Sequence, residues 1–223
     1  MASASRRGRP SRELHVLLDA HARALSACRR CTFHDPAILP VVSSSREPLA
    51  MLVGQAPGKT EVVDRRPFAG RAGKTLFRWF AEVGIAEIVA RRRIYIAAIT
   101  RCFPGSSPTG RGDRLPTPAQ ISNCSVWLDA EISIIAPRVI IPVGRLAIER
   151  FLGTGPLTEY VGRAHRLDKF ANAPLAIPLP HPSGASSWIH VPGHMDLVRS
   201  SLRLIAAHLP QLALESERVR SVA

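Results

Sequence analysis

The chain is short of acidic residues, cysteines and long apolar runs. It has 17 Asp and Glu against 30 Lys and Arg, and four Cys among 223 residues. No apolar run approaches the roughly 20 residues that cross a bilayer, and no apolar segment of a secretory signal follows the basic N-terminus. Four cysteines are too few for a disulfide-rich secreted scaffold. We therefore expect a reduced, cytoplasmic setting and no membrane partner.

The rest of the composition is that of a folded, strongly basic protein. Hydrophobic residues make up 46% and charged residues 21%, and the net charge is +13 at pH 7. This length favours a single domain, which we place at 11–213 in a monomer, between a disordered basic tail (1–10) and a C-terminal tail (214–223). The positive charge favours nucleic acid as a partner, although charge alone does not separate an enzyme from a passive binder.

Apolar strands alternate with amphipathic helices. The predicted strands are 49–53, 94–99, 139–143 and 175–179. The predicted helices begin near residues 11, 72, 117 and 192, and Gly144 opens a further short helix. The fold class is therefore α/β, a three-layer α/β/α arrangement with a central, mainly parallel four-stranded sheet. Ligands of such sheets bind beyond the carboxyl ends of the strands, where the loops 54–70 and 181–187 leave. Residues 103–116 are rich in Gly, Pro, Ser and Arg, a composition that predicts a mobile basic loop.

Two strings look like the end of a phosphate-binding loop, Gly58-Lys59-Thr60 and Gly73-Lys74-Thr75. The motif G-x-x-x-x-G-K-S/T needs another glycine five positions earlier, because its backbone N–H groups wrap a phosphate. Those positions hold Val53 and Phe68. We therefore exclude an NTPase of this type.

The four cysteines have a spacing typical of metal ligands. Cys28 and Cys31 form a C-x2-C pair after the first helix, Cys102 follows the second strand and Cys124 lies on the third helix. Buried cysteines can be small hydrophobes, but a C-x2-C pair with two more cysteines favours a thiolate-bound, mainly structural metal centre. Spacing alone does not distinguish zinc from an iron–sulfur cluster.

Two loops at the predicted carboxyl edge of the sheet carry residues that could bind or react with a ligand. The first, 54–73, contains several glycines, which let a backbone approach a ligand closely, and Phe68, which offers a face for stacking a base. The second places His181 directly after the fourth strand. By composition alone, the first would be an ordinary strand-to-helix turn and the second a core or surface histidine.

Together these motifs resemble the uracil-DNA glycosylase superfamily, most closely its family 4 and family 5 iron–sulfur branch, over residues 28–205. The family 4 pattern G-E-A-P-G-x-x-E, then G-x-P-F-x-G-x-A-G, corresponds to 54–61 and 65–73, and the family's H-P-S to 181–183. The cysteines match the order of the family's cluster ligands. Three matches in the right order make the resemblance specific.

The resemblance implies a monofunctional glycosylase that flips uracil out of single- or double-stranded DNA and hydrolyses its N-glycosidic bond, leaving an abasic site without a lyase step. It assigns catalysis to His181, Glu61 and Gln55. Phe68 would stack on the uracil, beside His181 and the backbone of Gly54, Gln55 and Ala56.

The same resemblance implies a cofactor and a mode of DNA binding. The 4Fe–4S cluster, with zinc as the less favoured metal, would be held by Cys28, Cys31, Cys102 and Cys124. Phosphate contacts would come from Ser183, Gly184, Ser186, Arg101 and Arg111. The protein would then act in the bacterial cytoplasm, at the nucleoid.

The sequence departs from the family 4 pattern at two pocket positions. Gln55 replaces a Glu, and a neutral amide can hold a water or a uracil carbonyl but cannot act as a general base. Its task would pass to Glu61, to Asp64 or to substrate phosphates. Ala98 replaces a uracil-reading Asn that family 5 also lacks, which implies relaxed selectivity for related deaminated bases. The R-R-I-H insertion of the DNA-crosslinking relatives is absent.

Two other functions stay open from the sequence. A non-catalytic DNA-binding relative would keep the fold, the metal centre and the basic surface but lose the chemistry with Gln55. An enzyme acting on a free nucleoside or nucleotide would not need the arginine-rich segment 101–114.

Overall fold

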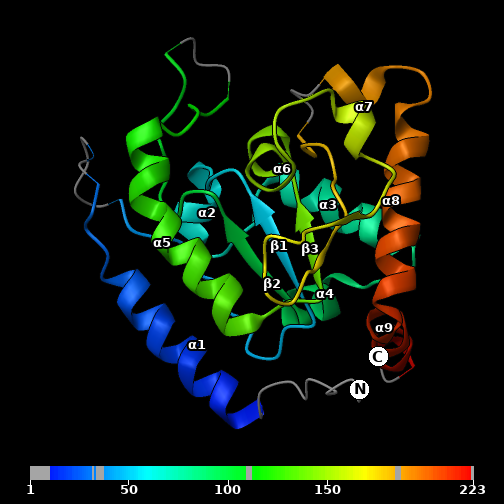
Figure 1. Ribbon diagram of the computed structural model, residues 1–223, viewed down its shortest axis with the longest axis horizontal. Helices are drawn as coiled ribbons and strands as arrows, with labels where there is room; N and C mark the ends of the chain where they lie inside the picture. The colour runs from blue at the N-terminus through cyan, green and yellow to red at the C-terminus, as the bar shows by residue number, and fades with distance from the viewer. Residues whose placement is uncertain (1–10, 32, 34–37, 109–111, 184–186, 222–223) are drawn as a thin grey trace.

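The computed structural model describes residues 11–31, 33, 38–108, 112–183 and 187–221. Helices lie on both faces of a central sheet, which confirms the three-layer α/β/α class (Figure 1). Within the described ranges the sheet has five strands in the order β2-β1-β3-β5-β4. These are β1 (Ala50–Gly54), β2 (Ile94–Ala98), β3 (Val139–Pro142), β4 (His165–Arg166) and β5 (Leu175–Ala176).

The predicted count of four strands is wrong by one. The four predicted strands pair in parallel, and the additional β4 pairs antiparallel with β5 at the edge of the sheet. No apolar run marks β4, because it consists of only His165 and Arg166. An isolated bridge between Val143 and Leu179 extends the pairing of β3 and β5 toward the carboxyl edge.

The helices of the described residues include the five predicted ones, among them the short helix that follows Gly144, and several additions. They are α1 (Ser11–Ser26), α2 (Lys59–Asp64), α3 (Arg71–Glu82), α4 (Glu87–Arg93), α5 (Pro118–Ile135), α6 (Arg145–Leu152), α7 (Leu157–Tyr160), η1 (Ser187–His190), α8 (His194–His208) and α9 (Pro210–Arg220). The predicted cap of α5 is present: the Gln120 N–H donates to Thr117 Oγ1 at 3.2 Å, and the Thr117 N–H donates to Gln120 Oε1 at 2.9 Å.

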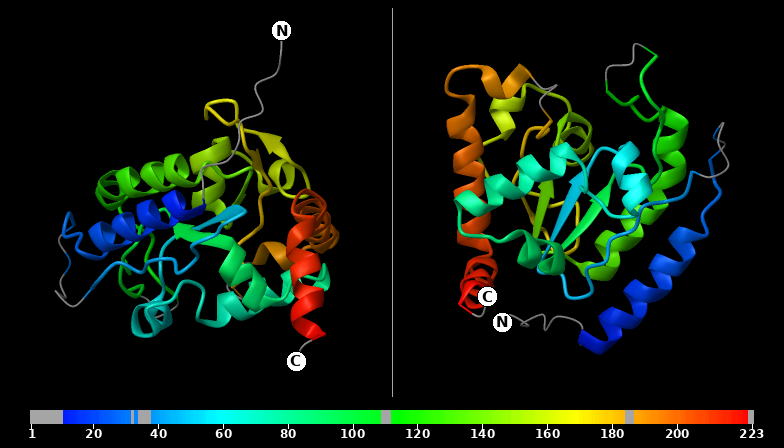
Figure 2. Two further views of the ribbon diagram at one scale, coloured as in Figure 1. Left: turned by 90° about the horizontal axis from the view of Figure 1, so that it is seen from below. Right: turned by 180° about the vertical axis from the view of Figure 1, so that it is seen from behind.

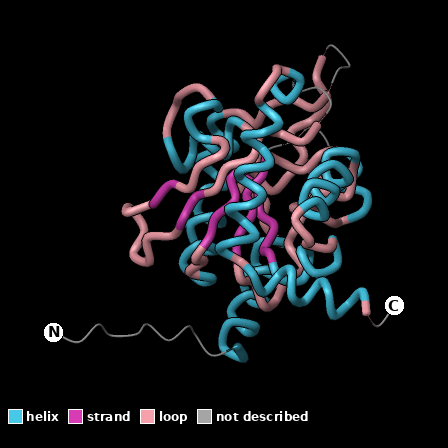
Figure 3. The backbone as a smooth tube through the Cα atoms, turned by 90° about the vertical axis from the view of Figure 1, so that its right-hand side faces the viewer, coloured by secondary structure: helices cyan, strands magenta, loops and turns pink. Residues whose placement is uncertain are grey.

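Strand side chains alternate between two apolar cores, because successive residues point to opposite faces of a sheet. Leu52 and Ile96 face α3, α4, α8 and α9. Met51 and Val53 face α1, α5 and α6. Figure 2 shows α3 and α4 across one face in its right-hand view, and Figure 3 shows the strands enclosed between helices. The strands are continuously apolar because helices cover both faces of the sheet.

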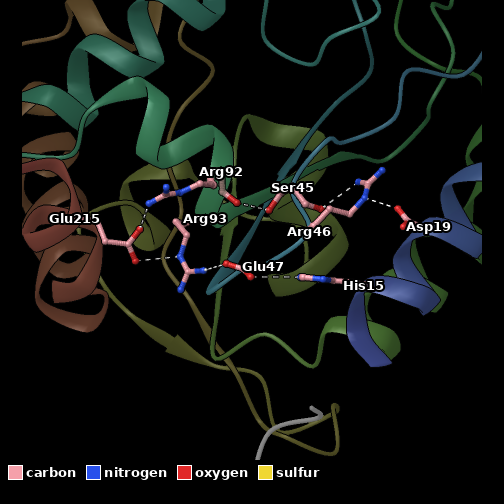
Figure 4. Close-up of polar contacts among 8 residues, drawn as sticks. All are labelled: His15, Asp19, Ser45, Arg46, Glu47, Arg92, Arg93 and Glu215. Carbon is pink, nitrogen blue, oxygen red and sulfur yellow. Dashed lines mark hydrogen bonds and ion pairs between the residues drawn. The ribbon is translucent and has the colours of Figure 1, made fainter. Parts of the chain in front are cut away.

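Charged side chains join three helices at the amino ends of β1 and β2 (Figure 4). Glu47 accepts a hydrogen bond from Arg93 Nη1 at 3.0 Å and lies 3.5 Å from His15 Nε2. Arg93 also pairs with Glu215 of α9 at 3.2 Å. This network ties α1, α4 and α9 together at the end of the strands opposite to the 54–70 loop.

The prediction of a C-terminal tail at 214–223 is wrong for residues 214–220, because α9 continues to Arg220. Ser216 of this helix is buried, and its hydroxyl accepts the Ala86 N–H at 2.9 Å. The helix has few apolar positions, so periodicity did not reveal it. The predicted tail 1–10 lies outside the described residues. None of the described helices combines the length and the hydropathy needed to span a bilayer.

Candidate active site

A cavity of about 110 Å³ lies at the carboxyl ends of β1 and β2, and it far exceeds the roughly 10–15 Å³ that one water needs. The structure brings both predicted loops to this cavity. Its lining includes Gly54, Gln55, Ala56, Pro57, Gly58, Glu61, Pro67, Phe68, Ala98, Asp113 and His181. The backbone carbonyls of Gly54 and Gln55 accept from the N–H groups of Ile99 and Thr100, which fixes the loop beside β2.

Glu61 fastens the two halves of the first loop to each other. Its Oε2 accepts the N–H of Gly58 and its Oε1 accepts the N–H of Gly70, each at 3.0 Å. The side chain lies on α2, a helix too short to show a periodic pattern, and is 9% exposed. Glu61 therefore holds the pocket in shape through both carboxylate oxygens.

Phe68 is held in a backbone conformation that bulky residues rarely adopt. Its φ is 50°, in the left-handed region, which costs about 1–3 kcal/mol. A Cβ added to Gly73 would lie 1.8 Å from the Phe68 carbonyl oxygen, so only glycine fits there. A Cβ added to Gly54 would lie 3.2 Å from Phe68 Cζ. The glycines of the motif therefore let the ring lie against the end of β1.

Arg91 of α4 holds this strained segment, and the sequence did not reveal it. Its Nη1 and Nη2 donate to the carbonyls of Pro67 and Phe68, each at 2.8 Å. The guanidinium also pairs with Glu87 at 2.7 Å and lies 4.2 Å from the ring centroid of Phe77. Arg91 stands first in a run of three arginines, which a sequence alone presents as a solvated basic surface.

His181 lines the cavity from the other side, and its hydrogen bonds determine its tautomer. The Ser183 N–H donates to His181 Nδ1 at 3.3 Å, and Ser183 Oγ lies 2.8 Å from the same nitrogen. Because a backbone N–H is only a donor, Nδ1 accepts and the neutral ring carries its proton on Nε2. Burial lowers the pKa of His181, and the nearby Glu61 carboxylate opposes that shift in part.

The His181 ring lies against Gly144, in the turn between β3 and α6. A Cβ added to Gly144, whose φ is 86°, would lie 3.2 Å from His181 Cδ2. The cavity therefore presents a phenyl ring, a neutral imidazole with one N–H donor and several backbone groups. Flat apolar surface with a few convergent polar groups suits a small planar ring.

Comparison with known proteins agrees with this geometry. The family model described as "Uracil DNA glycosylase superfamily" matches residues 42–200. The chain belongs to this superfamily. A type-4 uracil-DNA glycosylase of Archaeoglobus fulgidus is 27% identical over 173 residues, covering 74% of this chain and 81% of the relative. That of Thermotoga maritima is 30% identical over 168 residues, covering 75% and 82%.

A third relative extends the comparison with higher identity over a shorter region. The type-4 uracil-DNA glycosylase of Sulfurisphaera tokodaii is 37% identical over 95 residues, covering 43% of this chain and 39% of the relative. The superfamily match includes both cavity loops, Cys102 and Cys124, whereas Cys28 and Cys31 precede it.

The four cysteines gather at one site of this superfamily member. All four are unpaired and line one pocket between the end of α1 and α5. Asn123 Nδ2 donates to Cys31 Sγ at 3.8 Å, and the Arg101 backbone hydrogen-bonds Cys124. Burial and the neighbouring cysteines raise the pKa of Cys102 to about 12.

The donors of this pocket fit a thiolate-bound metal centre by type and number. Four cysteine sulfurs are the ligand set that structural zinc and iron–sulfur clusters share, and the hydrogen bonds to sulfur are those that stabilise bound thiolates. Within the described ranges, no three or more His, Cys, Asp or Glu side chains are already positioned to hold a single metal ion.

The predicted phosphate contact of Arg101 is wrong. Its side chain is 2% exposed and pairs with the buried carboxylate of Glu131. Glu131 also accepts from the Tyr95 hydroxyl at 2.8 Å and lies 3.1 Å from His21 Nε2. The arginine therefore joins β2 to α5 and cannot reach DNA. Ser183 is half-buried and bonded to His181, while Gly184, Ser186 and Arg111 lie outside the described residues.

The two residues that depart from the family 4 pattern both lie in the cavity, and Asp113 lies there as well, although the sequence did not predict it. Gln55 and Ala98 both line the cavity. Asp64 is exposed on α2 and is absent from the cavity lining, so it is not the replacement carboxylate. Asp113, from the segment predicted to be a mobile loop, does line the cavity. No local pattern singles it out, because its approach depends on how that loop folds back.

Proposed function

We propose that this protein excises uracil from DNA by hydrolysing the N-glycosidic bond, leaving an abasic site without a lyase step. The single observation that carries the proposal is the placement of Phe68 and His181 around one cavity at the carboxyl edge of the sheet. The names of the relatives support the same substrate. An extruded nucleotide is needed because the bond is inaccessible inside a stacked duplex.

The pocket residues then have distinct tasks. Phe68 stacks on the extruded uracil, and such stacking contributes about 1–3 kcal/mol per base. Negative charge develops on the uracil as its bond to the sugar breaks, and the Nε2–H of neutral His181 donates to the carbonyl oxygen that carries it. Gln55 binds a uracil carbonyl or a water through its amide, and Gly54 and Ala56 form the pocket wall.

Ala98 bears on which bases are accepted. A methyl group at this position offers no hydrogen bond to distinguish uracil from related bases, so we propose that other deaminated bases are also substrates.

The backbone N–H of Gly58 is already bound by Glu61, and is therefore not available to the base.

The cofactor proposed is a 4Fe–4S cluster held by Cys28, Cys31, Cys102 and Cys124, with zinc as the alternative. Such a centre would join the end of α1 to β2 and α5 and act in stability rather than in the reaction. Iron, sulfide and zinc analysis of freshly purified protein decides between the two metals. Absence of both would overturn this part of the proposal.

The substrate context follows from the charge and the proposed chemistry. A net charge of +13 favours binding to DNA phosphates, and Ser183, Gly184, Ser186 and Arg111 are proposed contacts near the pocket. We propose that the protein acts as a monomer on single- and double-stranded DNA, in the cytoplasm at the nucleoid.

The deciding experiment measures uracil release from oligonucleotides that contain one uracil, as single strands and as duplexes. We expect release and an alkali-sensitive abasic site with both substrates. No release by protein with an intact metal centre would overturn the proposal.

Gln55 supports one second candidate, a DNA-binding relative without catalysis. Such a protein would bind DNA in a salt-dependent manner and release no base. Gain of release in Gln55→Glu, from an inactive wild type, would favour this candidate.

A further inference from the structure

Hydrolysis of a glycosidic bond places a demand on this pocket that Gln55 does not meet. As the C1′–N1 bond breaks, positive charge builds on the sugar, and the attacking water must lose a proton. A carboxylate can serve both needs, whereas a neutral amide can serve neither. The inference below rests on the proposed function, because it concerns the same reaction.

Two carboxylates line the cavity, those of Glu61 and Asp113, and among the described residues only Glu61 has hydrogen bonds to its carboxylate. Glu61 uses its two oxygens to bind the N–H groups of Gly58 and Gly70. For Asp113, no hydrogen bond to the carboxylate is found among the described residues. Asp113 Oδ2 lies close to the first loop: a Cβ added to Gly58 would come within 3.0 Å of it.

Backbone hydrogen bonds pair the residues on either side of Asp113 with Gly105, Ser106 and Ser107. Ser106 and Asp113 form an antiparallel bridge. On either side of it, the Ser107 N–H donates to the Gly112 carbonyl at 3.0 Å and the Arg114 N–H to the Gly105 carbonyl at 2.8 Å. Arg114 Nε adds a bond to the Ser106 carbonyl at 2.9 Å. Within the segment predicted to be a mobile loop, these described residues form a small ladder that carries Asp113 to the cavity.

We propose that Asp113 is the catalytic carboxylate of this protein and takes the place of the glutamate that Gln55 replaces. In the reaction the C1′–N1 bond breaks and its electron pair leaves with the uracil, whose charge His181 stabilises. Water adds to C1′ and its proton passes to the Asp113 carboxylate. The uracil anion then takes up one proton and Asp113 releases one to solvent, so the products are free uracil and an abasic sugar, and water is the only co-reactant.

The surroundings of Asp113 make its carboxylate a stronger proton acceptor than an exposed aspartate. Burial raises the pKa of Asp113, and the nearby charge of Glu61 raises it further. The titratable groups that share the cavity are Glu61 from α2 and His181 from the segment after β5. A general base is most effective when its pKa approaches the working pH.

The test compares Asp113→Asn with Asp113→Glu and with Asp168→Asn. Asp168 is 80% exposed beside β4, does not line the cavity and takes the same charge change. The readouts are the single-turnover rate of uracil release across pH, and the affinity for an oligonucleotide carrying non-hydrolysable 2′-fluoro-deoxyuridine. Far-ultraviolet circular dichroism verifies folding.

We expect Asp113→Asn to slow release by about 100-fold or more, the lower range for loss of a general base, with affinity for the analogue unchanged or improved. The acidic limb of the pH–rate profile should disappear with it, and Asp113→Glu should retain more activity than Asp113→Asn. Asp168→Asn should behave as wild type.

Contrary outcomes separate this inference from the proposed function. An Asp113→Asn variant as fast as wild type overturns the role of Asp113 and leaves uracil excision standing. Equal losses in Asp113→Asn and Asp113→Glu with an unchanged pH profile overturn it too, because they indicate a structural role. A wild type that releases no uracil overturns both.

Discussion

Arg91 Nη2 donates a hydrogen bond to the carbonyl oxygen of Phe68 at 2.8 Å, across 23 residues of sequence. With the parallel bond to the neighbouring Pro67 carbonyl, this contact stabilises a strained backbone next to the base pocket. The position of the stacking ring is therefore determined in part by a helix that does not line the cavity.

We expect Arg91→Lys to destabilise the protein and to weaken substrate binding. One ammonium cannot donate to both carbonyls in the planar geometry of a guanidinium, and a lost charge-assisted hydrogen bond costs about 1.5–3 kcal/mol. Urea denaturation and single-turnover kinetics measure the two effects. The control is Arg92→Lys, since Arg92 is 59% exposed and pairs only with Glu215 among the described residues. Equal behaviour of the two variants would contradict this role.

Phe68→Leu should raise the DNA concentration needed for half-maximal uracil release by about 5- to 150-fold, corresponding to the roughly 1–3 kcal/mol of base stacking. Leucine keeps an apolar side chain but offers no aromatic face. The rate at saturating DNA should fall less than the affinity. An unchanged affinity for uracil-containing DNA would show that the ring does not contact the base.

His181→Ala should slow release by about 100- to 1000-fold, the scale for loss of one donor to a developing anion. Binding to DNA should change little, which anisotropy with a non-hydrolysable analogue measures. Wild-type rates in this variant would remove His181 from the reaction.

The same histidine predicts a pH dependence of stability. Because burial lowers the pKa of His181 below its ordinary 6.5, the unfolded chain binds a proton at a pH where the folded protein does not. Its contribution to the free energy of unfolding is therefore full above about pH 6.5 and is lost as the pH falls below that value. Urea denaturation between about pH 5 and 8 should show this slope reduced in His181→Ala.

Glu61→Gln should lower the free energy of unfolding by about 1–3 kcal/mol. Both carboxylate oxygens accept backbone N–H groups, and an amide nitrogen would place a donor against one of them. Activity should fall as well, because the loop holding Phe68 loses its fastening. Glu82→Gln, an exposed substitution on α3, serves as the control. A stability equal to the control would argue against the fastening role.

Glu131→Gln should be more destabilising, by about 3–5 kcal/mol, because it leaves the buried guanidinium of Arg101 without a counter-charge. Thermal and urea unfolding measure the loss. Occupancy of the proposed metal centre should fall in parallel, since Arg101 precedes Cys102 and its backbone contacts Cys124. A variant with wild-type stability would mean that this ion pair contributes nothing to the fold.

Local sequence determined much of this protein. Apolar runs gave four strands and their parallel pairing, Thr117 and Gln120 marked the start of α5, and the glycines of the first loop marked a close approach of backbone and ring. These features depend on residues a few positions apart, so short-range periodicity and steric limits were enough to predict them.

Contacts between distant segments were decided only by the tertiary structure. Arg101 follows a strand like many surface arginines, yet Glu131 lies thirty positions away and pairs with it in the core. Asp113 lines the cavity because the segment that carries it pairs with Ser106. Arg91 is one of three consecutive arginines, yet its guanidinium donates to the carbonyl oxygen of Phe68. Whether a charge is buried, paired or free depends on which segments pack against it, and residue order does not contain that information.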